Sequence, residues 1–426
     1  MCALVLALAV SCTGGTSSRT PTATVSAVSS PATEAPSATA APGAILLRVG
    51  ESAEIPEGVA LIVETGCWQC DGDYGRLVRI YRDASGALQE TPLLNVRGGH
   101  AVSPDGSQVA YSWCSRGACD GFNPTSPDVQ SSIQWSNDGG ITATTFGPFD
   151  GVYDVATVTR GLLVASGQTA DLQPLPLLRF PSGDVFTPPP GGAYPVSVGW
   201  DYIDWLTADR TAIQFGPDVG PLDLGAGHEI ARVQVESPSG DRLLVDWHER
   251  LPDGDIRFYA SIASWADQRW RIDHTFLLDG SVGRSGLWLD ADTLIGTYEF
   301  RAADLSASAG SSNGLGSYLL PALFDLKTNT LHPIVEPFAS KPPYAGGRNF
   351  VLAVMRGPFA RVANTGSCLN LRTEPRADAP VRICAADKVL LRTLGHEETA
   401  DGTAWIAVAM PDGVVDGWVS DEFIDR

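Results

Sequence analysis

The chain has 426 residues, and its 29 Lys and Arg against 49 Asp and Glu give a formal net charge of −20. An acidic surface repels nucleic acid, anionic lipid and teichoic-type polymers, so charge disfavours all three as partners. The 45 Gly, 30 Pro and 11 Trp residues favour a turn-rich β protein, and the length allows one large and one small domain.

Residues 1–12 read MCALVLALAVSC, an apolar run too short to span a bilayer as a helix and typical of an export signal. Its end resembles the bacterial lipobox, in which small residues precede a cysteine that is acylated and becomes the first mature residue. The resemblance implies that Cys12 carries a lipid and anchors the chain to a membrane. Cleavage near Ser11 without lipidation is the alternative. No Lys or Arg precedes the apolar run, which departs from the usual signal pattern.

Residues 13–43 are almost wholly Thr, Ser, Ala, Pro, Gly and Val. Such a segment has no apolar periodicity to bury and cannot repay the entropy of ordering, so we expect a disordered tether. Together with the signal segment it predicts an exported protein, held at a membrane or released outside the cell.

Six cysteines follow the leader, and an even number in an exported chain favours disulfides. Cys368 and Cys384 are the expected pair near the C-terminus. The other four allow three pairings, of which Cys67–Cys70 with Cys114–Cys119 is slightly favoured over the crossed alternatives. The CxxC run at 67–70 lacks the helix that a redox CxxC normally begins. Export to an oxidising space argues against a zinc site formed by these four cysteines.

Short apolar runs separated by Gly, Pro, Asp and Ser clusters continue from residue 55, which is an all-β rhythm. The clearest hairpin signal is the sequence SPDGS at 103–107, which lies between the apolar runs at 101–102 and 109–111. It resembles the turn of the TolB-type, WD40-like propeller repeat and recurs in weaker form at 237–245. We therefore predict a β-propeller over residues 44–357, with six blades or, alternatively, seven. The late strand Phe350–Met355 is expected to complete the first blade.

Two further sequence patterns typical of propeller turns support this prediction. Trp205–Asp209 and Trp288–Asp292 each precede an apolar strand, so both are predicted to be the same turn in different blades. Ser136–Thr142 resembles the Asp-box of sialidase-like propellers, in which Ser, Asp and Thr satisfy turn amides. The Arg cluster, Tyr–Glu pair and acidic Asp that sialidase-like enzymes need are not marked in the sequence. The six His residues have no metal-ligand spacing, so we expect no metal and no cofactor.

Residues 358–426 resemble a bacterial SH3 (SH3b) domain. The run CLNLRTEP at 368–375 matches its L-N-V-R-x-x-P start, and GTAWIAV at 402–408 and GWVS at 417–420 match its later strands. Alternation predicts a small barrel whose apolar face comprises Leu369, Leu371, Val381, Ile383, Val389, Leu391, Ile406, Val408 and Val419. The resemblance implies peptide binding, for which the candidate residues are Asn370, Arg372, Trp405 and Trp418. A role in the barrel core is the alternative for both tryptophans.

The sequence thus predicts a non-enzymatic cell-surface lipoprotein: an all-β chain with a six- or seven-bladed propeller followed by a small SH3-like barrel. Its partners would be the membrane, through the acyl anchor, and a peptidoglycan peptide, glycan or surface protein. A glycan-processing propeller enzyme and a structural scaffold are the alternatives.

Overall fold

A computed structural model describes residues 44–66, 76–93, 100–117, 119–120, 123–124, 128–159, 161–169, 171–196, 203–215, 221–225, 227–234, 237, 239–278, 284–301, 305, 317–339 and 348–426. In these ranges the chain is all-β, apart from the 3-10 turn η1 (Asp421–Phe423). Cys12, the signal segment and the tether lie outside them. Among the described residues, we find no helix with the length and hydropathy needed to cross a bilayer.

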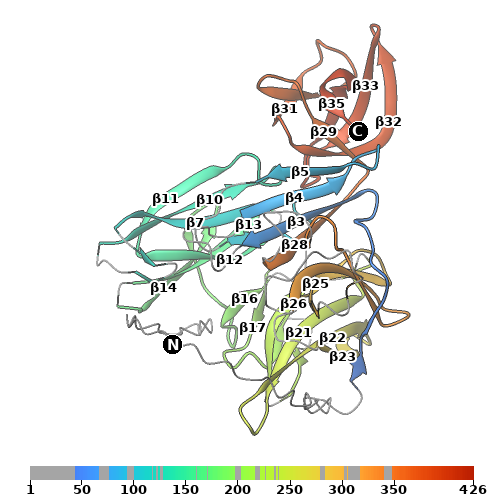
Figure 1. The fold of residues 1–426 in the computed structure, drawn as a ribbon. Coiled ribbons are helices and arrows are strands. Elements are labelled where there is room, and N and C mark those ends of the chain that lie inside the picture. The colour runs from blue at the N-terminus through green and yellow to red at the C-terminus, as the bar shows by residue number, and fades with distance from the viewer. Residues whose placement is uncertain are drawn as a thin grey trace, which may run out of the picture.

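Six small sheets of the described chain form a six-bladed β-propeller (Figure 1), which confirms the propeller and selects six blades over seven. Blade 1 has the strand order β28 (Arg348–Arg356), β3 (Val59–Gly66), β4 (Arg76–Arg82) and β5 (Leu88–Pro92). Blade 2 has the order β6 (His100–Val102), β7 (Val109–Arg116), β10 (Gln130–Ser136) and β11 (Thr144–Asp150). Blade 3 has the order β12 (Val152–Thr159), β13 (Leu162–Gln168), β14 (Pro174–Phe180) and β15 (Asp184–Phe186).

The remaining three blades follow in chain order. Blade 4 comprises β16 (Tyr194–Val196), β17 (Asp204–Leu206), β18 (Ala212–Gln214) and β19 (Leu222–Asp223). Blade 5 comprises β20 (His228–Gln234), β21 (Arg242–Arg250), β22 (Ile256–Ala266) and β23 (Arg269–Leu278). Blade 6 comprises β24 (Arg284–Trp288), β25 (Thr293–Arg301), β26 (Ser317–Asp325) and β27 (Thr330–Pro333). A separate two-stranded piece pairs β8 (Cys119–Asp120) with β9 (Asn123–Pro124).

Both ends of the propeller segment help to close the ring. Strand β28 pairs antiparallel with β3, so the predicted role of Phe350–Met355 in the first blade is confirmed. At the other end, β1 (Ile45–Leu46) adds in parallel to the edge of blade 5, and β2 (Arg48–Val49) adds to blade 6. Segments about 230 to 300 residues apart are thereby joined in shared sheets, because no blade buries both of its faces alone.

The SPDGS turn joins β6 to β7 as predicted. Ser103 Oγ accepts the Gln108 N–H at 2.9 Å, and Asp105 Oδ1 accepts the Ser107 N–H at 3.1 Å. Gly106 has φ +71°, the left-handed conformation that favours glycine. The Asp-box turn after β10 is also formed, since Asp138 Oδ1 accepts the Thr142 N–H at 2.9 Å. Local side-chain chemistry therefore fixes these two turns.

The C-terminal module, residues 358–426, is one seven-stranded sheet with the order β31-β30-β34-β33-β32-β29-β35. Its strands are β29 (Phe359–Val362), β30 (Cys368–Arg372), β31 (Val381–Ala386), β32 (Leu390–Ala400), β33 (Thr403–Ala409), β34 (Asp416–Ser420) and β35 (Ile424–Asp425). Seven of the nine residues predicted for its apolar face are buried in one cluster, and Ile383 packs against that cluster.

The prediction that Val381 faces the core is wrong, since its side chain is 47% exposed. The pairing of β30 with β31 shifts register between Leu371 and Arg372, so Leu371 lies opposite Ile383 but Arg372 lies opposite Val381. One extra residue in β31 breaks the two-residue alternation and turns Val381 to solvent.

The module docks on blade 1 (Figure 1) and on the Asp-box turn of blade 2, through contacts that we call the junction: Arg79, Asp138, Ile141, Lys388 and Leu390. Leu390 is buried with the apolar side chains of β3 and β4, and Ile141 packs against the module core. Arg79 is fully buried, and its Nη2 donates to the Lys388 carbonyl at 2.5 Å. Burial lowers the pKa of Arg79 to about 10, while the nearby Asp138 and Tyr81 raise it.

The predicted Cys368–Cys384 disulfide is confirmed, with the two Cα atoms 5.5 Å apart. Cys114 is disulfide-bonded as well. Cys67, Cys70 and the side chain of Cys119 lie outside the described residues, so the pairing within this group of four stays a prediction.

Candidate functional site

A hollow of about 300 Å³ opens on the surface of the C-terminal module. We call it the module hollow, and its lining residues are Thr365, Cys368, Leu369, Asn370, Arg372, Ala377, Thr403, Trp405, Ser420, Glu422 and Phe423. Three of the four predicted ligand-binding residues, Asn370, Arg372 and Trp405, are among them. The fourth, Trp418, does not line the hollow.

Strand register explains why these residues meet. Trp405 on β33 lies directly opposite Ser420 on β34, while the adjacent pair Ile406 and Val419 points into the core. Directly opposed residues of antiparallel strands share a face, so Trp405 and Ser420 face away from the core. The same alternation places Asn370 of β30 between the buried Leu369 and Leu371, on the face that carries the hollow.

Trp418 lies on this face one step along the sheet, because it is opposite Ala407 on β33 and opposite Arg372 on β30. It is half-buried and adjoins the hollow through Arg372 rather than forming its wall. Trp405 is only 5% exposed, so it is not a surface residue. It is also not a member of the apolar cluster that forms the module core. It forms an apolar wall whose indole Nε1 has no hydrogen-bond partner within the described chain.

The polar groups of the hollow differ in how firmly they are held. Arg372 Nη1 donates to the Ala379 carbonyl at 2.7 Å, which fixes its guanidinium against the β30–β31 loop. Ser420 Oγ donates to Glu422 Oε1 at 3.2 Å. Asn370 and Glu422 are both exposed, so an amide and a carboxylate are accessible to a ligand. The hollow therefore offers an amide, a cation, a carboxylate and an aromatic wall within one small volume.

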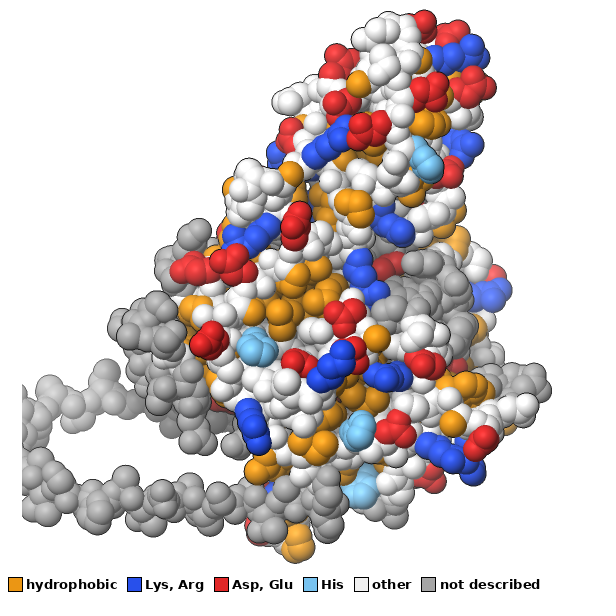
Figure 2. Space-filling model, turned by 90° about the vertical axis from the view of Figure 1, so that its right-hand side faces the viewer, with side chains coloured by type: hydrophobic (Ala, Val, Ile, Leu, Met, Phe, Trp, Pro, Cys, Tyr) orange, Lys and Arg blue, Asp and Glu red, His pale blue; other side chains and the backbone are white. Residues whose placement is uncertain are grey.

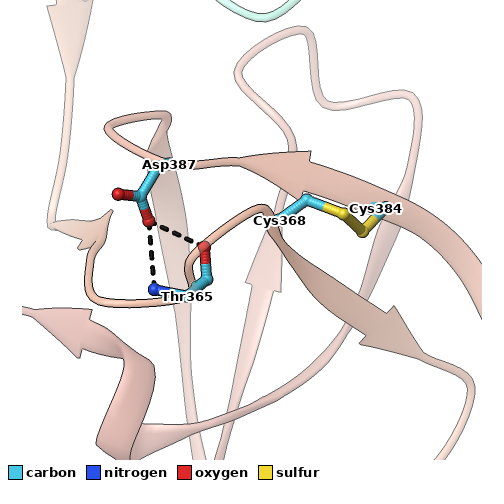
Figure 3. Close-up of a disulfide and its surroundings, with 4 residues drawn as sticks. All are labelled: Thr365, Cys368, Cys384 and Asp387. Atoms are coloured by element: carbon cyan, nitrogen blue, oxygen red, sulfur yellow. Dashed lines mark hydrogen bonds between the residues drawn. A yellow bond between two sulfur atoms is a disulfide. The ribbon is translucent and has the colours of Figure 1, made fainter.

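The disulfide and a nearby carboxylate brace one side of the hollow (Figure 3). Cys368 lines the hollow and is tied to Cys384 on β31. Asp387 Oδ1 accepts the Thr365 hydroxyl at 2.7 Å and the Thr365 backbone N–H at 3.2 Å. These hydrogen bonds hold the pKa of Asp387 below its usual value. The loop that enters β30 is thus clamped at two points.

Sequence reasoning missed several residues of the hollow, chiefly Thr365, Thr403, Ser420, Glu422 and Phe423. Ser420 and Thr403 could have been found by pairing β33 with β34 around Trp405. Glu422 and Phe423 belong to η1, whose position depends on contacts that no local pattern encodes.

A second cleft, of about 390 Å³, lies between blade 1 and the module. Its charged walls are internally neutralised: Arg82 pairs with Glu54 at 3.1 Å, Arg426 pairs with Glu397 at 2.6 Å, and Arg361 pairs with Asp425. Figure 2 shows acidic and basic side chains intermixed over the described parts of this face of the molecule. The cleft therefore does not select a ligand charge, and we regard the module hollow as the better candidate.

Metal chemistry finds no support in the part of the chain that the structure describes, where no group of three or more His, Cys, Asp or Glu side chains is arranged to hold an ion. The Asp-box carboxylate is committed to its own turn, where it accepts hydrogen bonds from Ile141 and Thr142. The turn that it stabilises carries Ile141, which packs against the module core.

No protein-family model and no curated protein matches the chain. Among solved structures, it is similar to a Bacteroides uniformis protein provisionally assigned as a 6-phosphogluconolactonase, with 11% identity, a TM-score of 0.35, and coverage of 86% of this chain and 96% of that one. A Mycobacterium tuberculosis puromycin-hydrolyzing peptidase gives 12% identity and a TM-score of 0.22 over 85% of this chain and 62% of that one. Similarities this weak carry no argument about function.

Proposed function

We propose that the protein is a non-enzymatic, lipid-anchored surface protein that binds a cell-wall peptide in the module hollow and a second partner on the propeller. One observation carries the proposal: three residues chosen from the SH3b resemblance, Asn370, Arg372 and Trp405, line a single hollow. They come from two strands that are 30 or more residues apart in the chain, so their meeting is not a local consequence of the sequence.

The chemistry of the hollow suits a peptide. An exposed amide pairs with a backbone N–H or C=O, an indole wall packs against a small apolar side chain, and a guanidinium and a carboxylate recognise charged termini. The volume of about 300 Å³ accommodates only a few residues, which predicts weak, short-peptide binding. Two weak sites on one tethered protein gain affinity through effective concentration.

Asn370 is the best position for a test, because Trp405 is buried and Arg372 braces a loop. Asn370→Ala should weaken co-sedimentation of the protein with purified peptidoglycan sacculi about tenfold, the loss expected for one hydrogen bond. Thr399→Ala on β32 is the matched control and should bind as wild type, because Thr399 is exposed, lies opposite Ala404 rather than Trp405, and does not line the hollow. Equal binding by both variants, or no sedimentation of the wild type, would reject the proposal.

Anchoring is tested separately at Cys12. We expect Cys12→Ala to move the protein from the membrane fraction to the medium and to remove the added lipid mass from the intact protein. If the wild-type protein carries no lipid mass, it is a secreted protein, and the peptide-binding proposal stands without the anchor.

A further inference from the structure

A carboxyl group with one fully buried oxygen lies at the contact between blades 2 and 3. Asp154 is on β12, the first strand of blade 3, which packs against β6 and β7 of blade 2. Its Oδ1 atom is buried and has no hydrogen-bond partner among the described residues. An ionised carboxylate in such a place is costly unless a proton or a cation compensates it.

The neighbours of Asp154 form a short polar cluster across the blades. His100 on β6 acts electrostatically on Asp154, and Ser112 on β7 hydrogen-bonds to it. His100 Nε2 also lies 3.5 Å from Glu64 Oε2 on β3 of blade 1. The imidazole therefore pairs with a carboxyl group of blade 1 and acts electrostatically on one of blade 3.

Few other charges act at this point. Besides β6 and β7, strands β10 (QSSIQWS), β13 (LLVASGQ) and β16 (YPV) neighbour β12, and none of the three contains a charged residue. Of the ionisable side chains on β6 and β7, His100 acts on Asp154, and Arg116 at the end of β7 is exposed. The side chains of His100 and Glu64 are 17% and 23% exposed, so the whole cluster is largely shielded from solvent.

We propose that Asp154 is a proton-binding latch between blades 2 and 3, beside the His100–Glu64 pair, and that it holds the blades together more firmly in mildly acidic surroundings and loosens them as the pH rises. The proton is the ligand, and Asp154 is its binding site. The latch requires no partner molecule, so it is independent of the peptide-binding proposal.

The sign of the effect follows from linkage. Burial raises the pKa of Asp154 to about 7, against the opposing effects of the Val155 backbone N–H, His100 and Ser112. Between pH 3.8, the usual pKa of the carboxyl group, and about 7, the folded state keeps a proton that the unfolded state has lost. The stability from this group therefore falls steadily with rising pH across that window and stays at its lower level above it.

The test compares the melting temperature of the full protein with that of Asp154→Asn from pH 4.5 to pH 8. The amide has the shape of the protonated acid, so Asp154→Asn should melt at a higher temperature than wild type by a margin that widens steadily from pH 4.5 to about pH 7 and reaches several degrees at pH 8. Asp184→Asn, an exposed position in the same blade, is the control and should follow the wild-type profile. Parallel profiles for wild type and Asp154→Asn would overturn the latch.

A second readout does not depend on stability. The carboxyl ¹³C resonance of Asp154, assigned from its loss in Asp154→Asn, should titrate near neutral pH. His100→Gln should move that midpoint to higher pH, because the histidine opposes protonation of Asp154. A midpoint near 4 in the wild type would refute the proposal even if the melting profiles differed.

Discussion

At the scale of single residues, Gly106 shows how one local turn controls a distant contact. Its φ of +71° suits glycine, and a Cβ atom there would lie 2.6 Å from Cγ of Met355 on β28, the strand that closes the ring. In the same turn, the Pro104 carbonyl oxygen accepts a hydrogen bond from the Val354 N–H at 2.9 Å. The SPDGS turn is therefore both a hairpin and a packing surface for ring closure.

Gly106→Ala should lower the free energy of unfolding by about 2–4 kcal/mol, the sum of left-handed backbone strain and overpacking against Met355. Gly86→Ala is the matched control: Gly86 has φ +81°, but nothing lies within 4 Å of its added Cβ, so about 1–2 kcal/mol is expected. Urea unfolding of both variants gives the two values. Equal losses would show that Met355 yields without cost.

At the scale of elements, the disulfide fastens β30 to β31 in a module that is near the lower size limit for an independent core. The double variant Cys368→Ser/Cys384→Ser should lose about 3 kcal/mol of stability, from loop-closure entropy regained by the unfolded chain. Serine substitution is preferred to a reductant, because Cys114 is also disulfide-bonded. Unchanged unfolding of the module would mean that its core alone suffices.

The elements also show what sequence predicts and what it does not. The turns at Ser103 and Ser136 were predictable because their hydrogen bonds join residues at most five apart. Val381 was not, because a one-residue bulge, invisible in an alternating pattern, reverses its direction. Asn370, Arg372 and Trp405 were found through a family resemblance, whereas Phe423, on the 3-10 turn η1, matches the ending of the same family pattern but was not singled out as a ligand-binding residue.

At the scale of the whole molecule, long-range contacts decide the architecture. Arg79 and Lys388 meet across 309 residues of chain, and nothing around Arg79 distinguishes it in the sequence from an exposed arginine. Asp154 likewise looks like one more acidic residue of an acidic protein. Burial is a property of the assembled blades, so the junction and the latch became visible only in the folded structure.

Ring closure by β28 predicts a sharp dependence on where the chain is cut. A chain ending at residue 357 keeps β28 in blade 1 and should fold as a compact propeller, although it exposes Arg79. A chain ending at residue 347 lacks β28 and should not fold cooperatively. Circular dichroism and size-exclusion chromatography distinguish the two, and a folded, compact shorter chain would contradict this account of closure.

The central claim is that the module hollow takes a short wall-derived peptide. Isothermal titration of the full protein with soluble peptidoglycan fragments tests it most directly, with Asn370→Ala and Thr399→Ala in parallel. The account predicts measurable binding by wild type and Thr399→Ala, and about tenfold weaker binding by Asn370→Ala. Equal affinity for all three proteins would place the ligand elsewhere, and no heat from the wild type would contradict peptide binding altogether.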